Sequence, residues 1–182
     1  MRIVSGTHKG KRITAPKKLP VRPTTDFAKE ALFNILNNQY NFQGLHVIDL
    51  FSGTGNISFE FASRGAHSII AVDAHFDCVK FINRITGELD FPISTVKSDV
   101  FKYLSAAPAT ADIIFADPPY DFDQDALQKL VDITFKKGLL REDGVLIIEH
   151  SKKMDLSSLE HFSVERKYGN SVFSFFPAAT EE

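Results

Sequence analysis

An apolar run that ends abruptly in Asp117-Pro118-Pro119-Tyr120 constrains the fold more than any other stretch of this chain. Residues 113–116 form a short, continuous and partly β-branched run, which is typical of a strand buried on both faces. Two prolines then prevent further ladder pairing and favour an extended conformation at Asp117. In open α/β sheets, ligands bind at the carboxyl ends of the strands. The stretch is therefore either a proline-rich loop after a core strand or a rigid corner of a binding site.

The bulk composition predicts one globular domain. The chain has 182 residues, of which 43% are hydrophobic, and this suffices for a full core. The single cysteine, Cys78, cannot form an internal disulfide, and no apolar run approaches the ~20 residues of a membrane span. The N-terminus has no apolar stretch of the kind that signal peptides carry. We therefore expect a cytoplasmic protein.

The first 22 residues are basic, whereas the rest of the chain is acidic. They contain seven lysines and arginines and no acid, and all 23 acidic residues follow them. Two β-prone runs, residues 2–5 and 12–14, flank a glycine-bounded turn and predict a small β-hairpin. A basic segment of this kind is typical either of contact with a polyanion or of a solvated basic tail. The side chains that would contact phosphates are Arg2, His8, Lys9, Lys11 and Arg12.

Beyond this segment, strand and helix patterns alternate along the chain, which predicts a doubly wound α/β fold. Thr24 or Thr25 caps the first helix, and its N-terminus together with Arg22 is suited to binding a carboxylate. The expected strands are residues 45–50, 68–72, 93–97, 113–116 and 144–150. The expected helices are residues 27–36, 57–64, 76–87, 101–104 and 123–137. A hairpin around residues 169–171 closes the chain with an antiparallel pair.

The loop after the first strand has the form of a nucleotide-binding turn. Gly53 and Gly55 let a ligand lie against the backbone, and Asp73 follows 18 residues after Gly55, a spacing typical of an acid that binds ribose. The dinucleotide fingerprint is broken, however, because Ser58 replaces its third glycine. Asp49 would repel a pyrophosphate but suits a ligand with an amine or sulfonium group. These residues favour S-adenosylmethionine over NAD, and the absence of Gly-Lys-Ser/Thr excludes a P-loop.

Four blocks of the sequence follow the pattern of one family. They are Arg2-Ile3-Val4 with Lys9-Gly10-Lys11-Arg12, residues 22–26 with 29–36, Asp49-x-Phe51-x-Gly53-x-Gly55, and Asp117-Pro118-Pro119-Tyr120. Glu149-His150 and Lys167-Tyr168-Gly169 look similar too. Through these blocks the chain resembles the RsmD family of class I S-adenosylmethionine-dependent methyltransferases, which methylate guanine N2 in small-subunit (16S) ribosomal RNA. It departs at Phe27, where family members commonly have an arginine, and at Asp73, where glutamate is more usual.

The resemblance implies a Rossmann-like fold. Its sheet would be seven-stranded and mostly parallel, with an antiparallel C-terminal strand and a small N-terminal β-hairpin. Residues 1–22 would form the RNA-contacting segment and residues 23–182 the methyltransferase domain. The residues expected to bind S-adenosylmethionine are Arg22, Thr24, Asp49, Phe51, Gly53, Gly55, Asp73, Asp99 and Val100. Asp73 would bind the ribose, Asp99 and Val100 the adenine, and Asp49 either the amine or the loop itself.

The resemblance also implies a catalytic corner. Asp117 and the Pro118 carbonyl would accept hydrogen bonds from the target amine and direct its lone pair towards the sulfonium methyl. Tyr120 would stack on the base, which must be unpaired or flipped out. The six histidines show no metal-ligand spacing, so we expect no metal.

Two other functions stay open. A DNA adenine-N6 methyltransferase would share the corner, but so short a basic segment leaves little for reading duplex sequence. A non-catalytic RNA-binding protein for ribosome assembly is the other. We expect the partner to be ribosomal RNA within a small-subunit particle, with no membrane contact and a monomeric state.

Overall fold

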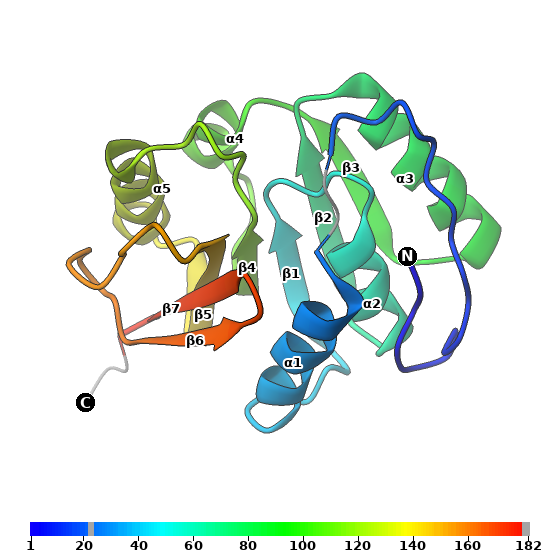
Figure 1. Cartoon of the computed structure of the whole chain (residues 1–182), viewed down its shortest axis with the longest axis horizontal. Helices are drawn as coiled ribbons and strands as arrows, with labels where there is room; N and C mark the ends of the chain where they lie inside the picture. Colours follow the sequence, from blue (N-terminus) through cyan, green and yellow to red (C-terminus); the bar gives the residue numbers. More distant parts are fainter. Residues whose placement is uncertain (22–23, 180–182) are drawn as a thin grey trace.

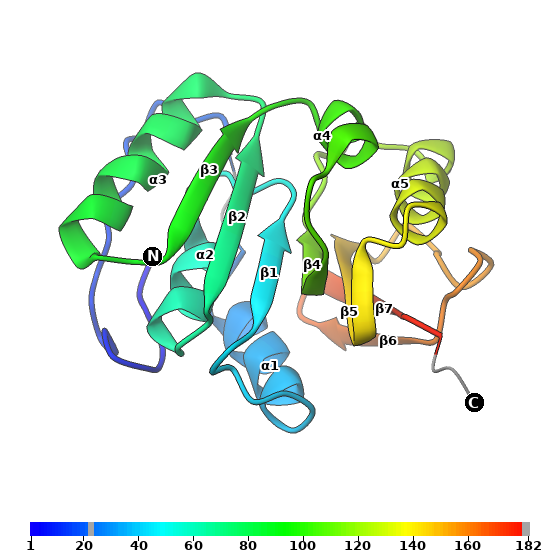
Figure 2. The same ribbon diagram turned by 180° about the vertical axis from the view of Figure 1, so that it is seen from behind.

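A computed structural model describes residues 1–21 and 24–179. Within these residues, seven strands form one sheet in the order β3-β2-β1-β4-β5-β7-β6 (Figures 1 and 2). Neighbours from β3 to β5 pair in parallel, whereas β7 is antiparallel to β5 and to β6. The strands are β1 (His46–Asp49), β2 (Ser68–Asp73), β3 (Ile93–Lys97), β4 (Ala111–Ala116), β5 (Leu140–Ser151), β6 (Val164–Tyr168) and β7 (Ser171–Pro177). This is the predicted class I methyltransferase fold, with its antiparallel C-terminal strand.

Five helices within the described residues cover the two faces of the sheet. They are α1 (Asp26–Asn37), α2 (Asn56–Ser63), α3 (Phe76–Leu89), α4 (Val100–Ala106) and α5 (Gln124–Lys136). Residues of α1, α2 and α3 pack in one hydrophobic cluster, and residues of α4 and α5 pack in the other (Figure 2). Along β4, Ile113 and Phe115 belong to the first cluster, and Ile114 and Ala116 to the second. The expectation that this strand is buried on both faces is therefore confirmed.

The local signals for helix ends were informative, whereas those for one strand were not. Of the two possible caps for α1, Thr25 is the one used, since its hydroxyl accepts a hydrogen bond from the Ala28 N–H at 3.2 Å. Strand β5 begins at Leu140, four residues before its predicted start. Its pairing with β4 shifts register between Ala111 and Ile113, and an irregularity of this kind has no simple sequence pattern.

The predicted N-terminal hairpin is present as a short antiparallel contact. Arg2 and Arg12 form a β-bridge, and the Ile3 N–H donates to the Lys11 carbonyl at 2.9 Å. Ile3 and Ile13 are buried in the same core cluster as the residues of α1. The segment therefore packs against the main sheet layer, as a marginal hairpin requires. The boundary at residue 22 stays a prediction.

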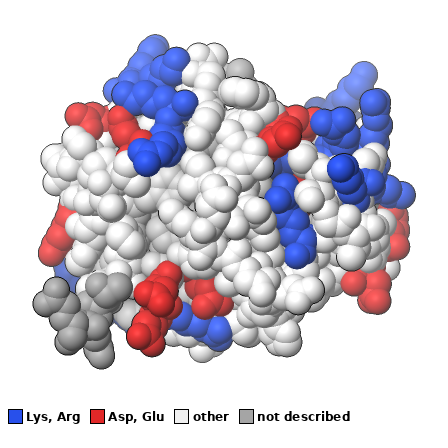
Figure 3. Space-filling model, turned by 90° about the horizontal axis from the view of Figure 1, so that it is seen from below, with Lys and Arg blue, Asp and Glu red and all other residues white. Residues whose placement is uncertain are grey.

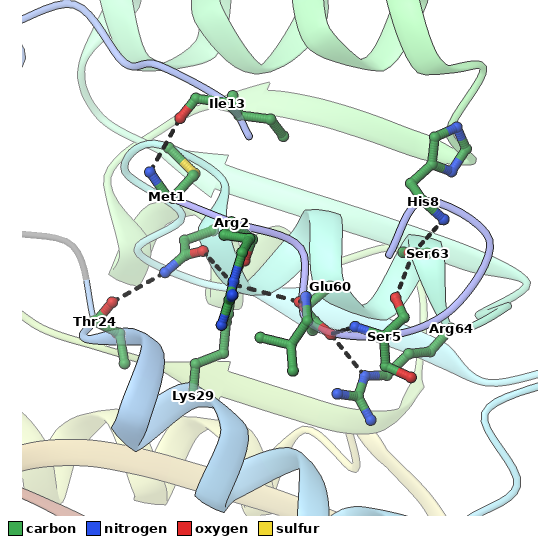
Figure 4. Close-up of polar contacts among 12 residues, drawn as sticks. Met1, Arg2, Ser5, His8, Ile13, Thr24, Lys29, Glu60, Ser63 and Arg64 are labelled. Carbon is green, nitrogen blue, oxygen red and sulfur yellow. Dashed lines mark hydrogen bonds and ion pairs between the residues drawn. The ribbon is translucent and has the colours of Figure 1, made fainter. Parts of the chain in front are cut away.

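A buried ion pair connects this segment to the core (Figure 4). The Lys29 ammonium lies 3.3 Å from Glu60, and both side chains are almost fully buried. It also donates to the Arg2 carbonyl at 2.6 Å and to the Asn56 side chain at 2.8 Å. Glu60 in turn accepts hydrogen bonds from the N–H groups of two residues of the N-terminal segment and from Arg64 at 2.9 Å. One carboxylate thus joins the N-terminal segment, α1 and α2.

Replacing Glu60 tests this connection. Glu60→Ala leaves the Lys29 ammonium buried without its counter-charge, so we expect the free energy of unfolding in urea to fall by about 3–5 kcal/mol. Glu88→Ala is the matched control, because it breaks the exposed Arg84–Glu88 pair, and its effect should stay below about 1 kcal/mol. Equal effects of the two substitutions would contradict the proposed role of Glu60.

Candidate active site

A cavity of about 820 Å³ opens at the carboxyl ends of the parallel strands. Its walls come from the ends of β1, β2, β3, β4 and β5, from the segment before α1, and from the turn between β6 and β7. The predicted site residues that line it are Thr24, Asp49, Phe51, Gly53, Asp73, Asp99, Val100, Asp117, Pro118 and Tyr120. Arg22 lies outside the described residues, so its predicted contact with the cofactor stays a prediction.

The predicted ribose ligand Asp73 holds the cofactor loop. One of its carboxylate oxygens accepts the Gly53 N–H at 2.8 Å, and the other accepts the His75 N–H at 2.8 Å. Gly53 has a φ of +51°, a conformation that glycine adopts without strain. Asp73 still faces the cavity, and each of its oxygens keeps a second lone pair for a hydroxyl group.

The motif predicted that Gly55 lies against the cofactor, whereas the structure places it at the N-terminus of α2. It caps the N-terminus of α2 with a φ of +81° and is not among the residues that line the cavity. A Cβ at this position would lie 2.7 Å from the Phe59 ring. The structure therefore requires glycine here for the close packing of α2, and its contact with the cofactor stays a prediction.

Asp49 is held by the residue that breaks the dinucleotide fingerprint. Its carboxylate is buried and accepts a hydrogen bond from the Ser58 hydroxyl at 2.7 Å. Burial, together with the nearby charge of Asp73, raises the pKa of Asp49 to about 7. Ser58 thus anchors this carboxylate from the first turn of α2, and the contact of Asp49 with the cofactor amine stays a prediction.

Asp99 forms the other wall of the predicted cofactor site. One of its oxygens accepts the N–H groups of Phe101 and Lys102 at 2.9 and 3.0 Å, so Asp99 is the N-cap of α4. Val100, the first residue of this helix, lines the cavity beside it. The sequence placed this acid at a strand end but did not show that it also caps a helix.

Asp117 is placed to receive a ligand. It follows β4, lines the cavity, and has no hydrogen-bond partner among the described residues. Burial first, and then the charges of Glu149 and Asp49, raise its pKa well above the ordinary value. A donor that enters the cavity at this point would relieve both costs.

Glu149 is a cavity residue that motif reasoning did not assign. It is buried near the end of β5, and its two oxygens accept hydrogen bonds from the Thr24 and Ser171 hydroxyls, each at 2.8 Å. Burial raises its pKa, and these two hydrogen bonds oppose the increase. Its neighbour His150 is held by the Ser151 carbonyl and the Ser174 hydroxyl.

Aromatic side chains surround the cavity. Tyr120 is 80% exposed and Phe27 is 65% exposed, and the Phe27 ring lies edge-on to Tyr168 at 6.3 Å between centroids. Deeper in, Phe122 packs edge-on against Phe51 at 5.3 Å. Three of these residues, Phe27, Tyr168 and Phe122, were not predicted as site residues, because aromatic residues occur throughout the chain and only their position at the cavity marks them.

The predicted RNA-contacting residues lie away from this cavity. Arg2, Lys9, Lys11 and Arg12 are exposed, whereas the His8 ring packs edge-on against Phe91 at 4.8 Å. None of the five lines the cavity. Figure 3, which views the molecule from below Figure 1, shows basic side chains both at its right-hand edge and at its upper left. Basic groups are therefore spread over more than the N-terminal segment.

The part of the chain that the structure describes holds no cluster of three or more His, Cys, Asp and Glu side chains suited to a metal ion. Among the same residues, no helix combines the length and the apolar character that crossing a bilayer requires.

The family model described as "Conserved hypothetical protein 95" matches residues 1–177. The chain is 34% identical over 161 residues to "Putative rRNA methyltransferase YlbH" of Bacillus subtilis. The match covers 86% of this chain and 85% of the relative. The chain belongs to the RsmD family of S-adenosylmethionine-dependent methyltransferases.

Further comparisons agree with this membership. Ribosomal RNA small subunit methyltransferase D of Escherichia coli is 25% identical over 157 residues, 82% of this chain and 74% of the relative. The solved structure of "Putative methyltransferase yhhF" from Escherichia coli has a TM-score of 0.86 at 20% identity and covers 100% of this chain and 99% of that chain. At that identity the structural similarity concerns the fold.

The cavity fits the methyl donor of this family. S-adenosylmethionine offers ribose hydroxyls, an amine and an adenine amino group, all hydrogen-bond donors, and the carboxylates of Asp73 and Asp99 lie at the ends of neighbouring strands. The loop at Gly53 presents backbone without a side chain. The volume lies within the range of cofactor pockets.

The raised pKa of Asp49 predicts a pH-dependent stability. Its pKa is about 7 in the folded protein against 3.8 ordinarily, so the folded state binds this proton more tightly. The contribution of this protonated carboxyl to the free energy of unfolding is fully present below about pH 4 and is lost as the pH rises to about 7. In Asp49→Asn, the free energy of unfolding in urea should therefore fall less steeply over this range. The remaining slope comes from Asp117 and Glu149, whose pKa values are also raised.

The exposed residue Asp90 supplies the control for this titration. It ends α3 in a left-handed conformation that asparagine tolerates, so Asp90→Asn should keep the slope of the unchanged protein. If Asp49→Asn keeps that slope too, Asp49 does not carry the raised pKa.

Proposed function

We propose that this methyltransferase transfers a methyl group from S-adenosyl-L-methionine to the exocyclic N2 amine of a guanine in small-subunit (16S) ribosomal RNA. The observation that carries the proposal is the Asp117 carboxylate, which faces the cavity with no hydrogen-bond partner among the described residues. Relatives named as ribosomal RNA methyltransferases support the substrate class. The exposed basic residues of the N-terminal segment fit contact with a phosphate backbone.

Asp117 and the Pro118 carbonyl make a poor nucleophile reactive. The lone pair of an exocyclic amine is conjugated with the ring of its base. Two acceptors at the corner after β4 would bind both N–H groups and turn the lone pair out of conjugation. S-adenosylmethionine, when bound, supplies an electrophilic methyl group on a positively charged sulfur. Asp117 then takes the proton that the amine releases, and its raised pKa makes it a better base.

The rest of the cavity holds the two reactants. We propose that the Gly53 loop passes the methionine part of the donor, that Asp73 binds the ribose, and that Asp99 and Val100 contact the adenine. The exposed Tyr120 ring would stack on the flipped base.

Identification of the methylated nucleoside tests the proposed reaction. The protein would be incubated with labelled S-adenosylmethionine and, in parallel, naked 16S RNA, partly assembled small-subunit particles and duplex DNA. We expect N2-methylguanosine from a ribosomal substrate. N6-methyladenine in DNA would establish the adenine methyltransferase instead, and no methylated nucleoside from any substrate would favour the non-catalytic role.

Asp117→Ala should separate catalysis from cofactor binding. Loss of both the acceptor and the base should lower kcat by at least about 100-fold. Calorimetry should show S-adenosylmethionine binding within about twofold of the unchanged protein, because the cofactor contacts lie on other strands. Asp121→Ala, at an exposed position four residues further on, is the control and should leave kcat unchanged. Normal turnover in Asp117→Ala would show that this carboxylate has no catalytic role.

Tyr120→Ala should lower the efficiency with which the protein methylates RNA. Loss of one stacking contact costs about 1–3 kcal/mol, so kcat/KM for RNA should fall roughly 5- to 150-fold. Affinity for S-adenosylmethionine, measured by calorimetry, should not change. The stacking role fails if the substitution weakens cofactor binding alone.

A further inference from the structure

Two carboxylates lie side by side at the carboxyl end of the sheet. Strands β4 and β5 pair in parallel with Ala116 opposite Ile148, so Asp117 and Glu149 come next on the two strands. Side chains at matched positions of neighbouring strands point to the same face of a sheet. The residues two positions earlier on both strands indeed share one core cluster. Both carboxylates line the cavity.

Glu149 is fixed in place by hydroxyl groups from two separate segments. Ser171, at the start of β7, donates to one oxygen, and Thr24, before α1, donates to the other. The Thr24 carbonyl is itself bound by the Asn56 side chain at 3.1 Å. Each carboxylate oxygen has a second lone pair, so Glu149 can still accept a hydrogen bond from a ligand in the cavity.

The bases that carry an exocyclic amine differ in the atom beside it. In guanine the amine at C2 neighbours the N1–H donor, whereas in adenine and cytosine the amine neighbours a ring nitrogen that accepts. We propose that Glu149 accepts the N1–H of the target guanine while Asp117 accepts the N2 amine, so that the two carboxylates select guanine. This inference rests on the proposed function and gives that site its base specificity. Adenine or cytosine would place the lone pair of a ring nitrogen opposite the Glu149 carboxylate. Two acceptors would then face each other, and neither would have a hydrogen-bond donor.

The aromatic rings around the cavity do not distinguish the bases in this way. Tyr120, Phe27 and Tyr168 present rings, and every base has a face on which a ring can stack. Asp49 is more deeply buried than Glu149 and is bound to Ser58. Of the two carboxylates whose charges act on Asp117, Glu149 is therefore the better placed to accept from the atom next to the amine.

A residue-by-base comparison tests this assignment. The wild-type product mapping first locates the target guanine, which is then replaced by 2-aminopurine, a base with the same C2 amine but a lone pair at N1. Wild-type kcat/KM should favour the guanine RNA by at least about tenfold. In Glu149→Gln, whose amide can donate to a ring nitrogen, this preference should shrink at least about tenfold. Because 2-aminopurine also lacks O6, the wild-type preference alone could reflect a contact with that oxygen. The test therefore depends on how the preference changes between the wild-type protein and Glu149→Gln.

The controls separate a specific role from a structural one. Glu142→Gln makes the same change at an exposed position of β5 and should keep the wild-type preference. If Glu149→Gln keeps it as well while N2-methylguanosine still forms, the inference is wrong and the proposed function stands. If the wild-type protein forms no N2-methylguanosine, the proposed function fails first.

A second variant covers the case in which Glu149→Gln is inactive on both RNAs. Ser171→Ala keeps the Glu149 carboxylate but frees one of its oxygens, so the preference for guanine should fall severalfold while binding of S-adenosylmethionine is unchanged. An unaltered preference in Ser171→Ala would then overturn the inference.

Discussion

The buried ion pair between Lys29 and Glu60 joins the N-terminal segment to α1 and α2, two helices that contribute residues to the cavity wall. Two charges at the centre of a protein are stable only when each is fully paired, and here the N-terminal segment supplies part of that pairing. Lys29 also donates a hydrogen bond to the Asn56 side chain, and the Asn56 amide donates to the Thr24 carbonyl. Thr24 in turn orients Glu149. A continuous series of polar contacts thus runs from the basic segment to Glu149 in the candidate active site.

The chemistry of the cavity follows from its carboxylates. Asp73 binds the loop after β1 at Gly53, and Asp49 binds Ser58 in α2, the helix that follows this loop, so the loop is held from both sides. Asp117 and Glu149 face the cavity, and burial raises the pKa of each. Ligands rich in hydrogen-bond donors compensate such groups, whereas phosphates do not. This accounts for the proposed binding of a sulfonium cofactor and a base amine at a site whose first loop looks like that of a dinucleotide-binding protein.

Local sequence signals predicted the fold and the edge of the sheet at which the cavity opens. Strand β4, the glycine loop and the carboxylates at strand ends were all predictable, because parallel strands bring their carboxyl ends to one edge. Glu149 could not be assigned in this way, since its orientation depends on Thr24, 125 residues away in the sequence. The packing role of Gly55 could not be read from its motif either, because the motif does not reveal the Phe59 ring, one helical turn further on, that fills the space beside it. In both cases the deciding contact is one that a side chain makes in the folded protein, which the motif itself does not encode.

The central claim is that one acid-lined cavity holds both the methyl donor and the target guanine. A crystal structure of the protein with S-adenosylhomocysteine and guanosine monophosphate tests it most directly. The account predicts the cofactor between Gly53 and Asp99, with the guanine N2 amine at hydrogen-bonding distance from Asp117 and N1 at that distance from Glu149. A cofactor bound outside this cavity, or a guanine whose amine faces away from Asp117, would contradict it.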